Sequence, residues 1–219
     1  MNQYLALKLQ GVMQAWGGHT YEDLRHTELI PTRSGVLGLL AACLGIDRDD
    51  IEQLEALAAS VRVALRADTV PQRIMDFHTV MDARKVSGKA NEYPVVSRRE
   101  YLCDAMFTVL LEIQSNAAIT RDRLEQAVKK PVYSPFLGRR SCVLSRPLYE
   151  DTLDAIDFRN AFSMIEPVAG TVYSETKPQE TSTPMRMRDV PLYARKRQFA
   201  SRQLYIYQLP GKESAHVPE

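Results

Sequence analysis

The chain has 219 residues, of which 45% are hydrophobic and 25% are charged. This balance is typical of a soluble globular protein with one sizeable core, and it excludes disorder as the default. No run of eighteen apolar residues occurs, which excludes a transmembrane helix. The first residues also lack the basic-then-apolar layout of a signal peptide, so we expect a cytoplasmic protein that contacts no membrane.

The formal net charge of +1 hides a strong segregation of charge along the chain. Residues 129–146 contain lysines and arginines but no acid, and residues 186–202 contain six basic residues against a single aspartate. Acids gather instead over 47–55 and 150–157. Separate basic and acidic faces allow a polyanion to bind on one side and protein on the other. The alternative is that these runs are solvated surface.

The first predicted element is a strand over 4–10, where leucines alternate with small or polar residues. A glycine-rich, polar loop is expected over 11–31. Thr32 or Ser34 then caps an apolar helix, and Gly45 closes it.

A second, amphipathic helix is expected to start at Asp47 or Asp49. Alternating apolar residues over 61–65 predict the next strand. The pattern then breaks down over about 69–103, which we interpret as a long hairpin or loop that projects from the body with a mobile tip around 85–91. An excursion of that length usually has a function.

Strand alternation returns over 107–113, a helix capped by Thr120 follows to Val128, and 143–149 can form another strand. The resulting order is strand, helix, strand, insertion, strand, helix, strand. This βαββαβ order predicts an α+β, ferredoxin-like domain of the kind that RNA-recognition domains also use.

We expect this ferredoxin-like domain to span 1–149, with its inserted hairpin at about 69–103. Residues 150–219 are predicted to form an irregular extension packed on it, with strand candidates at 171–174 and 204–209 and a loose tail from 211.

Two stretches near the N-terminus are candidate binding segments. In the stretch over 13–18, Gln14 can hydrogen-bond a base edge, Trp16 offers a stacking surface, and two glycines allow close backbone approach. The alternative is that Trp16 anchors a loop against the core. In the stretch over 31–35, Arg33 and Ser34 stand at a helix N-terminus, where backbone N–H groups favour a phosphate; plain capping, with Arg33 in solvent, is the alternative.

Two further stretches are basic. The loop over 133–141 places a glycine beside two arginines, which suits a phosphate backbone passing close to the main chain. Its candidate RNA-binding residues are Gly138, Arg139, Arg140 and Ser141. The stretch over 195–202 interleaves cations with one phenylalanine, as single-strand-binding surfaces do. Its candidates are Arg197 and Arg202, with solvated charge as the alternative for both stretches.

No metal, cofactor or nucleotide motif is present in the sequence. The three cysteines and four histidines fit no zinc spacing, so we expect no metal and no cofactor. A metal-free ribonuclease would need a general base, usually a histidine. His19 is the one tempting candidate, with Tyr21 or Lys8 as neighbours.

Together these motifs resemble one family. The segments MQAWG, PTRSGVLGLLAACLGI, RREYLCDA over 98–105, FLGRRS and RQFASR are similar to the CasD family of the type I-E CRISPR Cascade complex, and the similarity spans nearly the whole chain. The resemblance adds Arg98, Arg99 and Tyr101 to the candidate RNA-binding residues. It implies a RAMP-type fold in which the insertion forms a thumb-like β-hairpin.

The resemblance also implies a function in antiviral defence. A CasD-like subunit would hold the 5′ handle of the crRNA, cap the filament of backbone subunits and contact the large PAM-recognising subunit, meeting target DNA only through the complex. It would not be catalytic. The leading alternative is a metal-independent crRNA-processing endoribonuclease of the same fold, such as the related type I-C group with its tyrosine, lysine and histidine, although no motif here matches that trio. A protein-only scaffold is the third possibility.

Overall fold

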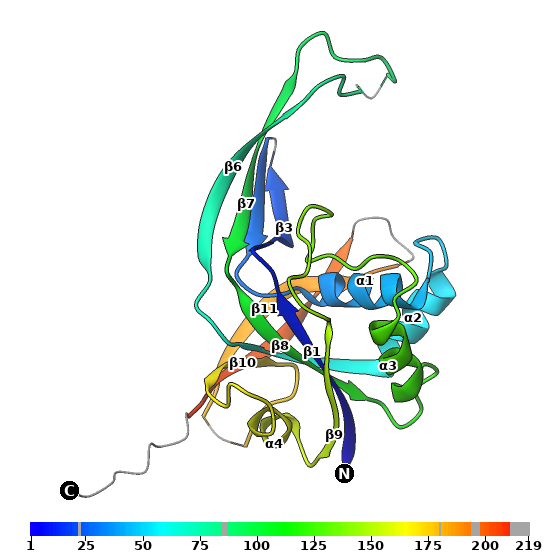
Figure 1. Ribbon diagram of the computed structural model, residues 1–219, viewed down its shortest axis with the longest axis vertical. Coiled ribbons are helices and arrows are strands. Elements are labelled where there is room, and N and C mark those ends of the chain that lie inside the picture. Colours follow the sequence, from blue (N-terminus) through cyan, green and yellow to red (C-terminus); the bar gives the residue numbers. More distant parts are fainter. Residues whose placement is uncertain (22, 85–86, 180, 194–197, 211–219) are drawn as a thin grey trace, which may run out of the picture.

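The computed structural model describes residues 1–21, 23–84, 87–179, 181–193 and 198–210, and leaves the side chains of 19–21 undescribed. Its body is a seven-stranded sheet with the order β11-β12-β10-β5-β8-β1-β9, in which every neighbouring pair is antiparallel (Figure 1). The strands are β1 (Asn2–Gln10), β5 (Val61–Ala67), β8 (Met106–Ile113), β9 (Tyr149–Ala155), β10 (Gly170–Ser174), β11 (Thr183–Pro191) and β12 (Phe199–Leu209).

Helices cover both faces of this sheet. The helices α1 (Arg33–Leu44), α2 (Ile51–Ser60) and α3 (Arg121–Lys129) share a core with Leu5, Leu7 and Leu9 of β1. The intervening Tyr4 and Ala6 point to the other face, where they pack with α4 (Phe158–Ser163). Strand β1 is therefore buried on both faces. The residues that alternate with its leucines, Tyr4, Ala6 and Lys8, are buried as well.

The helix termini agree largely with the sequence. Thr32 caps α1 by accepting from the N–H of Gly35, and Gly45 ends the helix with φ 74°. Thr120 caps α3 in the same way. The cap of α2 is Asp50 rather than Asp47 or Asp49. The carboxylate of Asp50 accepts a hydrogen bond from the backbone N–H of Gln53, in the first turn of the helix.

The prediction of a loop over 11–31 is wrong, because this segment forms strands of a second sheet. These are β2 (Met13–Gln14), β3 (Trp16–Tyr21) and β4 (Leu24–Glu28), which join β6 (Gln72–Val80) and β7 (Val95–Cys103). β4 pairs in parallel with β7, about seventy residues later in the chain. Local alternation does not reveal such long-range pairing.

The insertion over 69–103 is a hairpin. β6 pairs antiparallel with β7 along all nine of its residues, and the pair extends away from the body (Figure 1). Of the tip expected around 85–91, residues 85 and 86 lie outside the described part, and Arg84 bridges to Ala90.

The C-terminal part is more regular than expected. The strand predicted over 143–149 lies instead at 149–155, because Pro147 interrupts the earlier stretch. Beyond it, β10 pairs with β5, and β12 and β11 continue the same sheet. These residues therefore extend the main sheet, and the prediction of an irregular extension is wrong. The tail from 211 lies outside the described residues.

Candidate functional site

Three of the four stretches singled out in the sequence meet at one groove of about 490 Å³. Its walls come from three parts of the chain. Residues 15–35 supply the β2–β3 junction, β4 and the first turn of α1, and the other two parts are β7 and the loop after α3. Most of the lining comes from the stretches 13–18, 31–35 and 133–141 that the sequence predicts to bind. The lining residues are Ala15, Trp16, Gly17, Gly18, Arg25, His26, Thr32, Ser34, Gly35, Arg99, Gly138 and Arg139.

Gln14 and Trp16 form the floor beneath this groove. Both are 0% exposed. The Nε2 of Gln14 donates to the carbonyls of Leu9 and Ala105, at 3.2 and 2.7 Å, and its Oε1 accepts from Nε1 of Trp16 at 3.0 Å. The hydrogen-bonding groups of both side chains are thus satisfied inside the protein. The sequence predicted that Gln14 contacts a base edge and that Trp16 stacks on a base. Both contacts need an exposed side chain, and these two side chains are buried.

Two glycines of the motifs are explained by contacts within the protein. A Cβ at Gly35 would lie 2.9 Å from Cε3 of Trp16, so its absence lets the first turn of α1 sit on the indole. Gly138 has φ 91°, and a Cβ there would lie 1.7 Å from the carbonyl oxygen of Ala15. Gly138 therefore allows the main chain of the loop to approach the main chain of Ala15 closely.

Arg139 fastens the loop after α3 to the second sheet. Its guanidinium donates to the carbonyls of Glu100 and Arg25, at 2.9 and 3.0 Å, and its Cζ lies 4.6 Å from the ring centroid of Tyr101. Tyr101 is only 4% exposed, so it supports Arg139 from below. Arg140 and Ser141 are exposed, and Arg140 makes no hydrogen bond or ion pair with any residue that the structure describes.

Arg33 and Arg202 are neutralised within the chain. Both donate to Oε1 of Glu175 at 2.6 Å. Asp189 accepts two bonds from Arg202 and one from the backbone N–H of Arg33, at 2.6–2.7 Å. A carboxylate of this protein thus lies at the helix N-terminus where the sequence predicted a phosphate. Asp189 is the single acid of the basic stretch 186–202, and that is the one sequence signal that points to this pairing.

The remaining candidates differ in their surroundings. Arg98 is exposed and pairs with Asp23 at 3.2 Å. Arg99 lines the groove, and its Nε donates to the hydroxyl of Ser97 at 3.1 Å. Ser34 lines the groove through the first turn of α1. Arg197 lies outside the described residues.

Sequence reasoning misses two groove residues, Arg25 and His26. Nδ1 of His26 lies 3.1 Å from Oε1 of Glu100, whose Oε2 accepts from the N–H of Thr27 at 3.2 Å. Burial works to raise the pKa of Glu100, but the hydrogen bonds from Thr27 and His26 outweigh it and hold the pKa below its ordinary value. The local pattern predicts a loop over 11–31. It therefore gives no sign that Arg25 and His26 lie on a strand that pairs with β7.

The structure also bears on two other classes of site. Over the described ranges, no helix has the length and apolar character needed to cross a membrane. In the same part of the chain, no group of three or more histidine, cysteine, aspartate or glutamate residues could hold a metal ion.

Comparisons with known proteins agree on one family. The model of the family described as CRISPR-associated protein (Cas_Cas5) matches residues 4–205. The curated protein "CRISPR system Cascade subunit CasD" of Escherichia coli (strain K12) is 46% identical over 215 residues, which cover 94% of this chain and 96% of that protein.

Solved structures give the same result. A chain of a structure described as "CRISPR RNA-guided surveillance complex" superposes with a TM-score of 0.75 at 26% identity, covering 94% of this chain and 90% of that one. A second, described as "Crystal structure of Cas protein", gives 0.67 at 29% identity and covers 95% of both chains. The chain belongs to the Cas5 family of CRISPR-associated proteins.

Proposed function

We propose that this chain is a non-catalytic subunit of a type I-E Cascade complex, which holds the 5′ handle of the crRNA in the groove described above and acts in the cytoplasm. One observation supports this most directly: segments distant in sequence converge on a single groove that three arginines line, Arg25, Arg99 and Arg139. The similarity to a Cascade subunit along nearly the whole chain supports the same assignment.

The groove suits a single-stranded RNA backbone. Arg25 and Arg99 line it, and Arg140 is exposed in the loop that forms one wall. Such cations replace the counterions that a phosphate chain releases on binding. Gly17 is exposed and a Cβ built there would meet no atom within 4 Å, so this glycine leaves space that RNA can occupy. Arg139 and Tyr101 hold the wall in place, and Gln14 and Trp16 hold the floor.

The topology supports a ferredoxin-like fold with a thumb-like hairpin. Within the sheet, the order β5-β8-β1-β9 is that of the four strands of a βαββαβ unit, with α1 and α3 as its two crossover helices. The projecting β6–β7 hairpin would then be the thumb, and it would bend the RNA where the handle meets the spacer.

The same hairpin is the proposed contact for partner subunits. Strand β6 is exposed along most of its length, and Met75 and Phe77 are 53% and 68% exposed. Exposed apolar side chains of this size mark interaction surfaces. We propose that the chain caps the filament of backbone subunits and contacts the large PAM-recognising subunit, so that it meets target DNA through the complex.

The groove is tested by filling it. Gly17→Leu places a side chain in open space, so we expect unchanged thermal stability and a loss of affinity for single-stranded RNA that carries the handle sequence. The measurement is a gel shift with the assembled complex. Ser163→Leu adds an apolar side chain at an exposed position of α4, on the other face of the sheet, and serves as the matched control. Equal RNA affinity in both variants would count against the groove as the RNA site.

A second candidate function is supported by His26. A histidine beside a carboxylate, in a groove lined by arginines, has the parts of a metal-independent ribonuclease: a general base, a group that orients it, and cations that stabilise the phosphorane. His19, the base considered from sequence, has its backbone in β3, but its side chain is not among those described. Lys8, suggested as its neighbour, is buried and donates to Asp68 and Thr108.

A further inference from the structure

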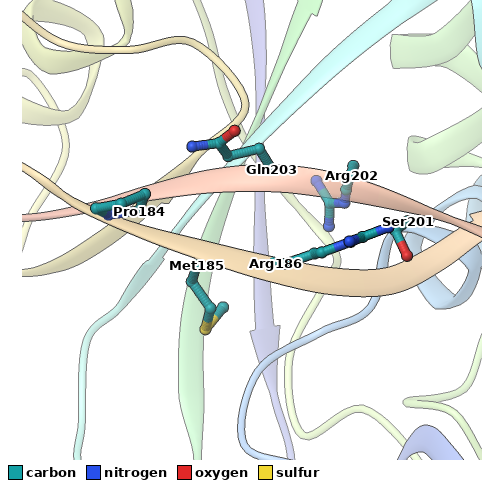
Figure 2. Close-up of a pocket in the computed structure, with 6 residues that line it drawn as sticks. All are labelled: Pro184, Met185, Arg186, Ser201, Arg202 and Gln203. Atoms are coloured by element: carbon teal, nitrogen blue, oxygen red, sulfur yellow. The ribbon is translucent and has the colours of Figure 1, made fainter.

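A second surface of the molecule carries exposed arginines that the groove does not use. It lies on β11 and β12, the two strands at one end of the main sheet. A shallow depression of about 460 Å³ is lined there by Pro184, Met185, Arg186, Ser201, Arg202 and Gln203. Figure 2 shows Arg186 extending along β11 toward Ser201.

Strand alternation gives this surface its composition. In the register of the two strands, Arg186 lies opposite Gln203 and Arg188 opposite Ser201, so these four residues share one face. All four are exposed. Met187, between the two arginines, and Leu204, next to Gln203, point to the opposite face and join the core beneath α1. We name the exposed face, defined by Arg186, Arg188, Ser201 and Gln203, the β11–β12 face.

The charge of this face is uncompensated. Arg186 makes no hydrogen bond or ion pair with a described residue. Arg188 uses only its Nε, which donates to the carbonyl of Phe199 at 2.9 Å. The single acid in the two strands, Asp189, is 3% exposed and engaged with Arg202 on the other side of the sheet. Arg186 and Arg188 therefore present their terminal N–H groups to solvent, and neither β11 nor β12 supplies a free carboxylate to pair with them.

We propose that the β11–β12 face binds the phosphate backbone of a nucleic-acid strand, as a contact additional to the groove. Arg186 and Arg188 stand two residues apart on one strand, about 7 Å from each other, and each can clamp a phosphate through two N–H groups. The hydroxyl of Ser201 and the amide of Gln203 add donors of the kind that contact phosphate and sugar oxygens.

A nucleic acid fits this face better than a protein partner does. The face has no cluster of large apolar side chains of the kind that forms the centre of a protein interface. The aromatic residues next to it on β12 are Phe199, which is 37% exposed, and Tyr205, which is half-buried. Two sources of phosphate are available if the chain acts as proposed above, the guide RNA and the target DNA. The proposal rests on that function only in requiring that the complex holds nucleic acid.

The test uses the assembled complex with the double variant Arg186→Ala/Arg188→Ala. The control is Arg48→Ala, which removes an exposed arginine between two aspartates. One arm measures affinity for single-stranded handle RNA over a salt series, and the other measures binding of a duplex DNA that matches the guide. Log affinity decreases linearly with log salt. For each phosphate contact that is lost, this decrease should become shallower, by about 0.7 for single-stranded RNA and about 0.9 for duplex DNA.

A weaker affinity and a smaller salt slope in the RNA arm alone support the guide as the ligand, and the same changes in the DNA arm alone support the target. Unchanged affinity and slope in both arms overturn the proposal. Weaker subunit assembly with both arms unchanged also overturns it, since it assigns the face to a protein partner. Failure of the proposed function has a different signature: Gly17→Leu would then leave handle-RNA affinity unchanged, whatever the double variant does.

Discussion

Nδ1 of His26 and Oε1 of Glu100 lie 3.1 Å apart at the edge of the groove. The two residues come from β4 and β7, which pair in parallel within the second sheet. When Nδ1 carries a proton it donates to the carboxylate, and this fixes the orientation of the imidazole. Because Glu100 also accepts from Thr27, one buried carboxylate fastens β4 to β7 and sets the position of a groove side chain.

Glu100→Gln should therefore lower stability in a pH-dependent way. The pKa of Glu100 is lowered in the folded protein from its ordinary 4.5, so its carboxylate stabilises the fold at pH values above 4.5. This contribution is lost as the pH falls through the lowered pKa. We expect the variant to melt below the wild type near neutral pH, and the two Tm values to converge as the pH falls below 4.5 and through the lowered pKa of Glu100. A Tm difference that stays constant over this range would show that the ionisation of Glu100 contributes nothing.

Gly138→Ala should destabilise the whole chain. The residue has φ 91°, and a Cβ would overlap the carbonyl of Ala15. Backbone strain of this kind costs about 1–3 kcal/mol, and the overlap adds to it. Each kcal/mol lowers Tm by about 2–4 °C in a chain of this size. Differential scanning calorimetry measures the change, and a Tm equal to that of the wild type would contradict the described approach of the loop to Ala15.

Arg139 and Arg140 should behave differently although they are neighbours. The sequence alone predicts that replacing both weakens handle binding and leaves the fold intact. Arg139→Ala removes two hydrogen bonds to carbonyls and a cation–π contact, so it should cost about 1–3 kcal/mol of stability. Arg140→Ala should leave Tm unchanged and lower the salt slope of RNA binding by about 0.7.

Melting curves and a salt series on the two single variants check this. Equal Tm values for both variants would contradict the positioning role of Arg139. An unchanged affinity and slope for Arg140→Ala would show that this arginine is solvated surface in the complex.

The elements that could be predicted from the sequence are those whose cause is local. The leucine alternation of β1 and the caps Thr32, Gly45 and Thr120 depend on residues within a few positions, and the structure confirms them. Over 13–28, β2 and β4 pair with β7, far along the chain, and β3 pairs with β4; the local pattern carries no sign of these strands. The strand candidates at 171–174 and 204–209 are confirmed as β10 and the second half of β12. β11 and the first half of β12 are not predicted, because their pairing with each other leaves no apolar pattern in the local sequence.

The candidate site shows the same division. Three of the four stretches that the sequence singles out contribute to one groove. The role of each side chain could not be predicted, since it depends on neighbours from other segments. Arg33 and Arg202 are held by Glu175 and Asp189, whereas Arg25 of the groove stands outside every basic stretch. Asp189, in the same stretch as Arg202, is the one local sign of this pairing, and nothing near either arginine in the sequence points to Glu175.

The projecting hairpin should make the chain depend on partners. Met75 and Phe77 lie on one face of β6 and are exposed, so the isolated chain should self-associate and gain Tm when the other Cascade subunits are added. Met75→Ser/Phe77→Ser should reduce self-association and weaken binding to the backbone subunit, with handle-RNA affinity unchanged. Met164→Ser, at an exposed methionine beside α4, is the control. A wild-type chain that is monodisperse alone and gains no Tm in the complex would contradict this expectation.

Catalysis separates the two candidate functions. Cleavage of RNA without metal requires a base that deprotonates a 2′-hydroxyl, and general base catalysis contributes about 10²–10⁴ in rate. His26 and His19 are the histidines of β4 and β3, and His26 lines the groove beside Glu100. If the groove holds RNA without cutting it, His26 serves only as a contact of the RNA. His19→Ala and His26→Ala should then leave guide-RNA maturation unchanged, and His26→Ala should at most weaken handle binding.

The measurement is incubation of the purified wild-type chain with repeat RNA in the presence of a chelator, with separation of the products by length. We expect intact RNA for the wild type and for both variants. Cleavage at the handle boundary by the wild type, absent in His26→Ala and retained in Ser163→Leu, would overturn the non-catalytic assignment and make His26 the general base. Absence of cleavage in His19→Ala alone would instead assign that role to His19. Since Glu100 orients the imidazole of His26, Glu100→Gln should in the first case lower the cleavage rate more than it lowers RNA affinity.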